Sequence, residues 1–341
     1  MRRGEEMEVL IVNQREVPEL LPMDECIDVM ADALTGLVRG DAVMPLRGMA
    51  GLPDQAGLLA WMPSLRPEAG VMGIKVISVF SGNEGSELES HQGAVLLFEA
   101  ERGRLLAIAD ASSVTAIRTA AVSGLATRLL ARDDADDLAI LGSGTQARTN
   151  LEAMLAARDV NRIRLWSRNL EHAKSFAESE SRRHGISVEV SATAQEAVEG
   201  ADIVCTTTSA TEPVLQGRWL DQGVHVNAVG FSGPTGRELD TEAVLRARLF
   251  ADRRESILNE SGDFLIAKSE GAIGDDHVVG ELGEVILGKV EGRTLPEEIT
   301  VFESLGLAIE DLAAAHHIYR RAMETGKGTR VELGGDRHVD G

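Results

Sequence analysis

The chain is poor in cysteine and in long apolar runs. Of its 341 residues only two are cysteines, Cys26 and Cys205, and both stand inside apolar segments. Two buried, reduced thiols are therefore expected, with neither a disulfide framework nor a metal site. No apolar run reaches the length of a membrane span, and the N-terminal residues lack the apolar core of a signal peptide. We expect a cytoplasmic protein that does not enter a membrane.

Basic residues are also scarce. The sequence has 34 Lys and Arg against 55 Asp and Glu, which gives a net charge of -21. So acidic a surface repels phosphate backbones, and no basic stretch with interleaved aromatics offsets it, which excludes nucleic acid as a partner. An anionic small molecule would have to be held by a few local cations. With 43% hydrophobic and 26% charged residues, the length suits a globular protein of two domains.

The second part of the sequence alternates short apolar runs with amphipathic helical segments. This alternation predicts a parallel sheet with helices on both faces, whose ligands bind at the carboxyl ends of the strands. Strands are predicted at Leu138–Leu141, Arg162–Trp166, Val188–Val190, Ala201–Thr206, Val224–Val229 and, as the last, Leu249–Ala251, and helices at Thr145–Ala157, Leu170–His184, Ala194–Glu199 and Asp240–Arg246.

The first 120 residues follow another pattern. Glycine-containing turns separate runs that are typical of antiparallel strands, between two long helical stretches. The predicted fold class is α/β, with a Rossmann domain at 121–309 and a mostly antiparallel α+β domain at 1–120 and 310–341. In the antiparallel domain we predict strands at Gly57–Met62, Gly73–Phe80, Ala94–Glu99 and Leu105–Asp110. Helices are predicted at Pro22–Arg39, Ser112–Leu130 and Leu305–Thr325, and the last is expected to pack back on residues 1–120.

The run from Leu138 to Ala147 has the pattern of a dinucleotide-binding turn. Gly142 would allow the tight bend, Gly144 the approach of a pyrophosphate, and Ala147 the close packing of the helix on the strand. The helix N-terminus would then offer free N–H groups to the phosphates. Because the glycines follow a strand and open a helix, they predict a nicotinamide dinucleotide site.

The residues at the end of the next strand distinguish NAD from NADP, because an acid there would bind the ribose hydroxyls of NAD. Here the strand ends in Trp166-Ser167-Arg168-Asn169. A hydroxyl beside a guanidinium suits a 2′-phosphate, so we favour NADP(H), with NAD(H) as the alternative. The other interpretation of Arg168 is a solvated side chain at a strand end.

Two cations stand in segments that a fold would bury. Lys75 lies in Gly73-Ile74-Lys75-Val76-Ile77, and Arg118 lies in an otherwise small and apolar helical stretch. A buried cation is costly unless it is paired, so each implies an anionic partner, either a ligand or an internal acid. Arg47, in Met44-Pro45-Leu46-Arg47, indicates less by itself.

Together these segments resemble the ornithine cyclodeaminase/mu-crystallin family over nearly the whole length. The resemblance implies a Rossmann domain joined to a mostly antiparallel domain that binds substrate and forms a homodimer. It rests on Met44-Pro45-Leu46-Arg47, Trp61-Met62-Pro63, Gly73-Ile74-Lys75, His91-Gln92-Gly93, Arg118-Thr119-Ala120-Ala121, Gly142–Ala147, Asn227-Ala228-Val229-Gly230, Glu281-Leu282-Gly283-Glu284-Val285 and Thr300–Gly306.

The resemblance also implies where ligands bind. Arg47, Lys75 and Arg118 would surround the carboxylate and imine of a small-molecule substrate, with Arg118 also near the cofactor. Cofactor contacts are expected from Arg118, Thr119, Gly142, Gly144, Thr145, Gln146, Ala147, Ser167, Arg168, Thr206, Thr208, Val229, Gly230 and Ser304.

The sequence departs from part of the family at Ser232. Ornithine cyclodeaminases and the archaeal-type alanine dehydrogenases carry an Asp there, and a serine hydroxyl takes no proton without a base beside it. Ala60 likewise aligns where cyclodeaminases have a carboxylate. A serine followed by Arg237-Glu238-Leu239-Asp240 is instead similar to the ketimine-reductase branch, which includes mu-crystallin.

The working hypothesis is NAD(P)H-dependent reduction of an α-imino acid, such as Δ1-pyrroline-2-carboxylate, to the L-amino acid. Arg47 and Lys75 would pair with the carboxylate. Lys75 would also give the proton that the imine needs, because burial next to Arg118 would lower its pKa toward neutrality, and a water held by Ser232 is the substitute. The alternatives are an alanine-type amino-acid dehydrogenase, an ornithine cyclodeaminase, and a non-catalytic protein that binds NADPH or a small ligand.

Overall fold

The computed structural model describes residues 8–53, 56–83, 87–230 and 233–333. The chain divides into two compact units, one from residues 1–118 and 307–341, the other from 119–306. We predict these divisions at 120/121 and 309/310; the first lies inside helix α3 (Ala111–Leu130). None of the helices described has both the length and the apolar character needed to cross a membrane.

The first unit is built on a seven-stranded sheet. Its strands pair antiparallel except for β1 and β6, which run parallel. The order is β15 (Thr329–Glu332), β1 (Glu8–Val12), β6 (Leu105–Asp110), β5 (His91–Glu99), β4 (Val71–Val79), β3 (Leu58–Arg66) and β2 (Gly48–Gly51). The short turns η1 (Pro67–Ala69) and η2 (Ser81–Asn83) follow β3 and β4.

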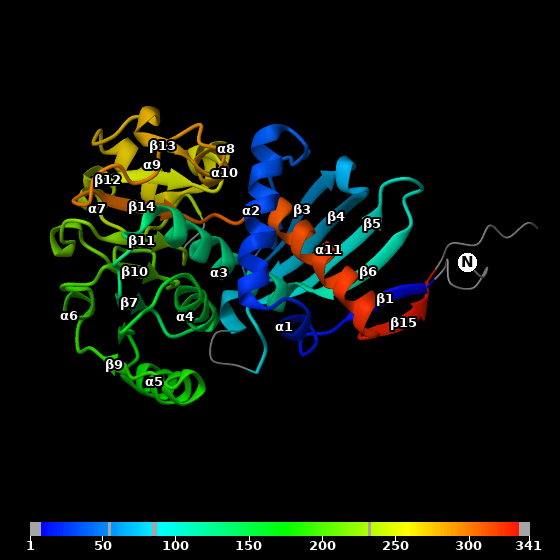
Figure 1. Ribbon diagram of the computed structural model, residues 1–341, viewed down its shortest axis with the longest axis horizontal. Helices are drawn as coiled ribbons and strands as arrows, with labels where there is room; N and C mark the ends of the chain where they lie inside the picture. The colour runs from blue at the N-terminus through cyan, green and yellow to red at the C-terminus, as the bar shows by residue number, and fades with distance from the viewer. Residues whose placement is uncertain (1–7, 54–55, 84–86, 231–232, 334–341) are drawn as a thin grey trace, which may run out of the picture. The chain divides into compact units, whose positions relative to one another are not determined.

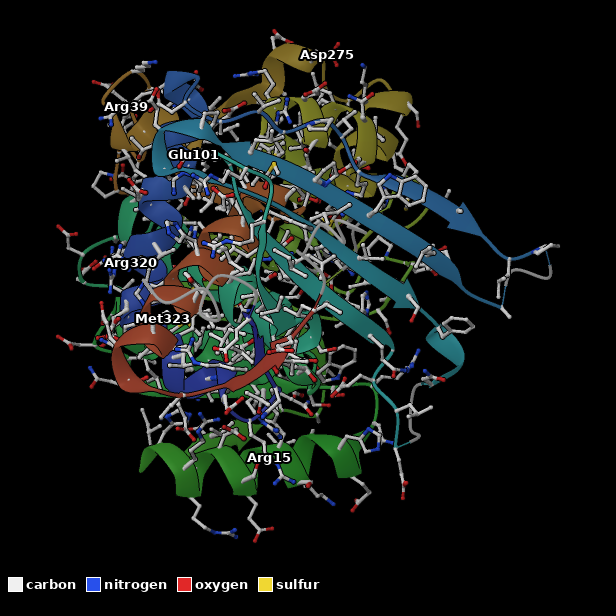
Figure 2. The ribbon with its side chains drawn as sticks, turned by 90° about the vertical axis from the view of Figure 1, so that its right-hand side faces the viewer. Arg15, Arg39, Glu101, Asp275, Arg320 and Met323 are labelled. Carbon is white, nitrogen blue, oxygen red and sulfur yellow. The ribbon has the colours of Figure 1, made fainter. Side chains whose placement is uncertain are left out.

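Helices cover one face of this sheet. α11 (Ala308–Thr325) packs on β3, β4 and β5, and α2 (Met23–Arg39) lies beside it, with the short α1 (Val17–Leu20) before α2 (Figure 1). The apolar residues Ile27, Met30 and Leu34 recur at helical spacing in α2 and are fully buried. Arg320 and Met323, toward the C-terminal end of α11, are exposed on the side of the helix away from the strands (Figure 2).

The opposite face of the sheet carries apolar side chains that the helices do not cover. Along β3 the burial alternates, with Ala60 and Met62 buried and Leu59 and Trp61 exposed by 47% and 38%. Strand side chains alternate between faces, so Leu59 and Trp61 lie on the face away from α11. On the edge strand β2, Met49 is exposed by 60%, but it pairs with Ala60 and therefore lies on the other face.

The second unit is a Rossmann-type layer structure around an eight-stranded sheet whose pairs are all parallel. The order is β13 (Val278–Glu281), β12 (Ala247–Ala251), β14 (Ile299–Glu303), β11 (His225–Ala228), β10 (Ile203–Thr206), β7 (Asp137–Leu141), β8 (Arg162–Trp166) and β9 (Val188–Val190). The strand order therefore reverses between β7 and β10, the place where such sheets bind ligands.

The helices of this unit connect successive strands, and the apolar core lies between them and the sheet. A side-chain cap starts α5, because Asn169 accepts from the N–H groups of Glu171 and His172. The helices are α4 (Thr145–Ala157), α5 (Leu170–His184), α6 (Ala194–Val198), α7 (Thr241–Arg246), α8 (Arg254–Glu260), α9 (Gly262–Ser269) and α10 (Leu282–Ile286), with the short η3 (Gly217–Trp219) and η4 (Asp275–His277).

The predicted fold class is confirmed, with corrections in detail. The prediction that Leu249–Ala251 is the last strand is wrong, because β13 and β14 follow it and β14 is inserted between β11 and β12. Strands β1, β2 and β15 of the first unit are not predicted either. These strands have four or five residues each, too few to show a periodicity. The C-terminal helix does pack on the first sheet, as predicted, but it starts at Ala308.

Candidate active site

The glycine-rich turn lies at the switch point of the second sheet. β7 pairs with β8 on one side and β10 on the other, so the turns after these strands meet at one edge. The N–H of Gly142 donates to the Trp166 carbonyl at 2.8 Å, and the N–H of Thr207 donates to the Leu141 carbonyl at 2.8 Å. These bonds fix the turn against the ends of both neighbouring strands.

Only glycine suits position 142. Its φ is +123°, and a Cβ there would lie 2.6 Å from the Thr207 hydroxyl oxygen. Gly144 caps α4 in an extended conformation, and a Cβ on it would meet nothing within 4 Å. An open space at the N-terminus of a 13-residue helix fits a phosphate group of a dinucleotide.

The other predicted cofactor residues lie around this edge. Ser143 donates its hydroxyl to the Ser167 oxygen at 2.9 Å, which joins the turn to the end of β8, and Arg168 follows as an exposed side chain. Thr145 and Gln146 form the first turn of α4, and Ala147 is fully buried beneath it. Val229 and Ser304 directly follow β11 and β14, and the N–H of Ser304 donates to the Ala228 carbonyl at 2.9 Å. Thr119 is a buried residue of α3.

Glu238 organises two of the loops at this edge. Its carboxylate accepts from the Thr206 hydroxyl at 2.9 Å, from the N–H and hydroxyl of Thr208 at 2.7 and 2.6 Å, and from the N–H of Gly230 at 2.7 Å. A Cβ on Gly230 would lie 2.6 Å from a Glu238 oxygen. Burial raises the pKa of Glu238, and these donors act against that shift. The buried Thr206 hydroxyl therefore serves Glu238.

Three more buried acids, Asp263, Glu303 and Asp252, form an electrostatic group with Glu238. Asp263 accepts from the N–H groups of Glu238 and Leu239 at 3.0 and 2.6 Å, and Glu303 accepts from the Ser261 hydroxyl at 2.8 Å. Burial raises the pKa of Asp263 to about 7, partly opposed by the N–H of Leu239, and the pKa of Glu303 is raised by burial and then by Asp263.

Asp252, the last member, accepts from the N–H groups of Leu305 and Gly306, each at 2.8 Å. It is 1% exposed, and its charge helps to raise the pKa of Glu303. We call Glu238, Asp252, Asp263 and Glu303 the acid cluster.

In the first unit, the two cations that the sequence singles out are buried, as predicted. Lys75 on β4 is 2% exposed and Arg118 on α3 is 3% exposed. Lys75 Nζ lies 2.8 Å from Asp311 Oδ2, and Arg118 Nε donates to Asp311 Oδ1 at 2.9 Å. Arg118 Nη1 donates to Glu310 Oε2 at 2.8 Å. The expected anionic partners are therefore internal acids from the first turns of α11, and we call these four groups the mixed cluster.

The protonation of the mixed cluster follows from this pairing. Burial lowers the pKa of Lys75 to about 8; the Asp311 carboxylate opposes that shift, and the charges of Arg118 and Arg47 add to it. Burial acts to raise the pKa of Asp311, but Arg118 and Lys75 outweigh burial and lower it. Asp311 is thus an anion, while Lys75 is an ammonium that can release a proton near neutral pH.

Two further groups interact electrostatically with Lys75. Arg47 is half-buried in the segment before β2, and its charge acts on Lys75 as stated above. His91 begins β5, and its pKa is lowered by burial and then by the Lys75 charge, while Glu89 opposes the shift. The predicted trio of Arg47, Lys75 and Arg118 therefore forms one electrostatic group.

Sequence reasoning does not find the acids of either cluster. Glu310 and Asp311 interrupt the run Ala308-Ile309-Glu310-Asp311-Leu312-Ala313-Ala314-Ala315, the same kind of signal that singles out Lys75. Glu238 enters only as part of a family match. Ser232, a predicted catalytic residue, lies outside the described residues.

The chain is similar to known proteins over most of its length. A family model described as the ornithine cyclodeaminase/mu-crystallin family matches residues 7–326. A Δ1-pyrroline-2-carboxylate reductase of Bacillus cereus is 36% identical over 326 residues, which cover 95% of this chain and 100% of the relative. Ketimine reductase mu-crystallin of Mus musculus is 41% identical over 280 residues, which cover 82% of this chain and 85% of the relative.

Among solved structures, the chain is similar to Δ1-pyrroline-2-carboxylate reductase of Thermococcus litoralis in complex with NADH and L-proline. The TM-score is 0.92 at 38% sequence identity, and the match covers 95% of this chain and 100% of the other. Both units of the fold thus have a counterpart in a structure of known ligands.

Proposed function

The chain belongs to the ornithine cyclodeaminase/mu-crystallin family, and from that membership we propose that it is an NAD(P)H-dependent reductase of α-imino acids. The substrate class is a ketimine such as Δ1-pyrroline-2-carboxylate, the compound named for two of its relatives. The product is the corresponding L-amino acid.

The observation that carries this proposal is the state of Lys75. It is an ammonium group, 2% exposed, whose pKa burial lowers to about 8. An imine accepts hydride far better once its nitrogen is protonated, and a donor with a pKa near the working pH transfers a proton most effectively. Lys75 has the pKa and the burial that this step requires.

Each group then has one role in a balanced reaction. When bound, the dinucleotide would supply a hydride to the imine carbon. Lys75 gives a proton to the imine nitrogen, the C=N double bond becomes a C–N single bond, and the lysine amine regains a proton from water. Arg47 pairs with the substrate carboxylate, since its charge acts on the same site as Lys75.

For the dinucleotide we propose a preference for NADP(H) over NAD(H). Ser167 and the exposed Arg168 at the end of β8 support it, since a hydroxyl and a guanidinium suit a 2′-phosphate. The Thermococcus litoralis relative was solved with NADH. Dissociation constants of NADPH and NADH from wild type and Arg168→Ala test the preference, which the variant should abolish. Equal affinities in the wild type would contradict it.

We also propose that the protein is a homodimer through the uncovered face of the first sheet. Leu59 and Trp61 expose apolar surface there, and apolar patches on a sheet face are typical of interfaces. Light scattering after gel filtration tests this, because Leu59→Lys should shift a dimer of the 36.5 kDa chain toward monomer. A wild-type monomer would contradict it.

The test of the function is a substrate panel with NADPH and NADH. It contains five- and six-membered cyclic ketimines, iminosuccinate, pyruvate with ammonia, and ornithine. Oxidation of the dinucleotide with a cyclic ketimine, and formation of the L-amino acid, is the expected result. Faster turnover of pyruvate with ammonia, or consumption of ornithine without net change in cofactor, would assign the protein to another activity of the family.

A further inference from the structure

Asp311 contacts both buried cations of the mixed cluster. Its Oδ2 lies 2.8 Å from Lys75 Nζ and its Oδ1 accepts from Arg118 Nε at 2.9 Å. The carboxylate is 1% exposed and belongs to the N-terminal part of α11, where the helix dipole favours an anion. Glu310, its neighbour, contacts Arg118 and the N–H of Leu307 instead.

We infer that Asp311 is a positioning residue, which holds Lys75 as an ammonium and directs one of its N–H bonds to the imine. An ammonium has three donors. Lys75 Nζ forms an ion pair with Asp311 Oδ2 at 2.8 Å and donates to Thr115 Oγ1 at 3.3 Å. These two partners leave an N–H bond for the substrate nitrogen. This inference rests on the proposed reduction and adds the residue that prepares its acid.

The charges around Lys75 explain why an anion is needed. Arg47 and Arg118 repel the ammonium, and burial disfavours its charged form. His91 on β5 is held toward its neutral form, and Glu310 pairs with Arg118. Asp311 is therefore the group that keeps the proton on Lys75 in the free enzyme. After transfer, the neutral amine stays beside Asp311, which favours its reprotonation from water.

A titration without substrate tests this directly. The sequence has five lysines, so the full chain labelled with ¹³C at the lysine ε-carbons gives a simple spectrum, and Lys75→Arg identifies the signal of Lys75. In Asp311→Asn the midpoint of Lys75 should fall by about 1–3 pH units, the effect of one opposite charge at contact distance. An unchanged midpoint would overturn the inference.

Glu310→Gln is the matched control. It removes an anion from the same turn of α11 and from the same arginine, whereas Asp311 also forms an ion pair with Lys75. Its Lys75 midpoint should fall less than in Asp311→Asn. In imine reduction, the loss of activity at high pH should move down by the same amount as the Lys75 midpoint, and so further in Asp311→Asn than in Glu310→Gln. Equal shifts in the two variants would overturn the specific role of Asp311.

Asp311→Glu covers the case in which Asp311→Asn does not fold. It keeps the charge but moves the carboxylate by one methylene, so Lys75 should titrate as in the wild type while kcat falls at every pH. Wild-type kcat in Asp311→Glu would overturn the positioning role. The titration uses no substrate, so it tests the role of Asp311 independently of the reaction. If the protein reduced no imino acid, that result would overturn the proposed function alone.

Discussion

The two units bury ionisable groups in different ways. In the mixed cluster of the first unit, two cations face two acids at 2.8 to 2.9 Å. In the acid cluster of the second unit, Glu238, Asp252, Asp263 and Glu303 have backbone N–H groups and hydroxyls as donors. The first compensates charge with charge, whereas the second uses dipoles and, at Glu238, Asp263 and Glu303, raised pKa values.

This difference matches what each cluster does in the proposed reaction. Burial lowers the pKa of Lys75 to about 8 and the Asp311 carboxylate limits that shift, which suits a group that gives up a proton near neutral pH. Acids that accept from N–H groups fix loops, and Glu238 joins the loops after β10 and β11 in this way. The following variants should separate a chemical role for the mixed cluster from a shaping role for the acid cluster.

The largest effect is expected in the mixed cluster, from Lys75→Met. Loss of the proton donor should lower kcat for imine reduction by about 10²- to 10⁴-fold, the usual contribution of general acid catalysis. The dissociation constant of the dinucleotide should stay unchanged, and both are measured by steady-state kinetics and by fluorescence titration.

Lys268→Met, which removes a half-exposed lysine of α9, is the control and should keep wild-type kcat. Imine reduction that survives in Lys75→Met would mean that another group gives the proton.

In the acid cluster, Glu238→Gln should weaken dinucleotide binding and not the chemical step. A glutamine cannot accept from all four donors, and each lost buried hydrogen bond costs about 1–3 kcal/mol. We expect the dissociation constant to rise about 10-fold or more, with kcat changed less. Glu242→Gln, an exposed acid of α7, is the control, and equal effects of both variants on binding would contradict the shaping role.

Replacing an acid by its neutral amide should lower the free energy of unfolding more in the mixed cluster than in the acid cluster. Glu310→Gln leaves Arg118 without one of its acids, and breaking a buried ion pair costs about 3 kcal/mol or more. Asp263→Asn keeps the Oδ1 acceptor and resembles the protonated acid, so the free energy of unfolding at pH 7 should change by less than about 1 kcal/mol. Urea unfolding followed by circular dichroism measures both, and the opposite order would break the comparison.

A smaller effect concerns pH. The pKa of Asp263 is raised to about 7 in the folded protein, so the native state binds its proton more tightly than the unfolded chain does. This contribution is present below the unfolded pKa and is lost as pH rises toward 7, at about 1.4 kcal/mol per unit. Asp263→Asn should therefore flatten the decline of the unfolding free energy between about pH 4 and 7. Equal slopes in wild type and variant would contradict this.

The sequence predicts the architecture better than the site. Long helices such as α2 and α5 are predicted almost to the residue, because an apolar stripe, a glycine C-cap or an asparagine N-cap marks them. β13 and β14 are missed because strands of four or five residues carry too little pattern.

The sequence predicts the buried cations of the candidate site but not the acids that pair with them. Lys75 and Arg118 stand out because a cation in an apolar segment breaks the local pattern, but their partner Asp311 is 193 residues from Arg118 along the chain. Nothing local in α11 says which cation its acids meet. Glu238 is missed for the same reason, since its donors Thr206 and Thr208 precede it by about 30 residues.

The most direct test of Lys75 as the acid is the pH dependence of kcat/KM for reduction of Δ1-pyrroline-2-carboxylate, from pH 6 to 10. The protonation of the free imine is measured separately and divided out. A single loss of activity with an apparent pKa of about 8, absent from the residual activity of Lys75→Met, is the predicted result. A profile that stays flat to pH 10, or the same loss in both proteins, would contradict the assignment of the proton to Lys75.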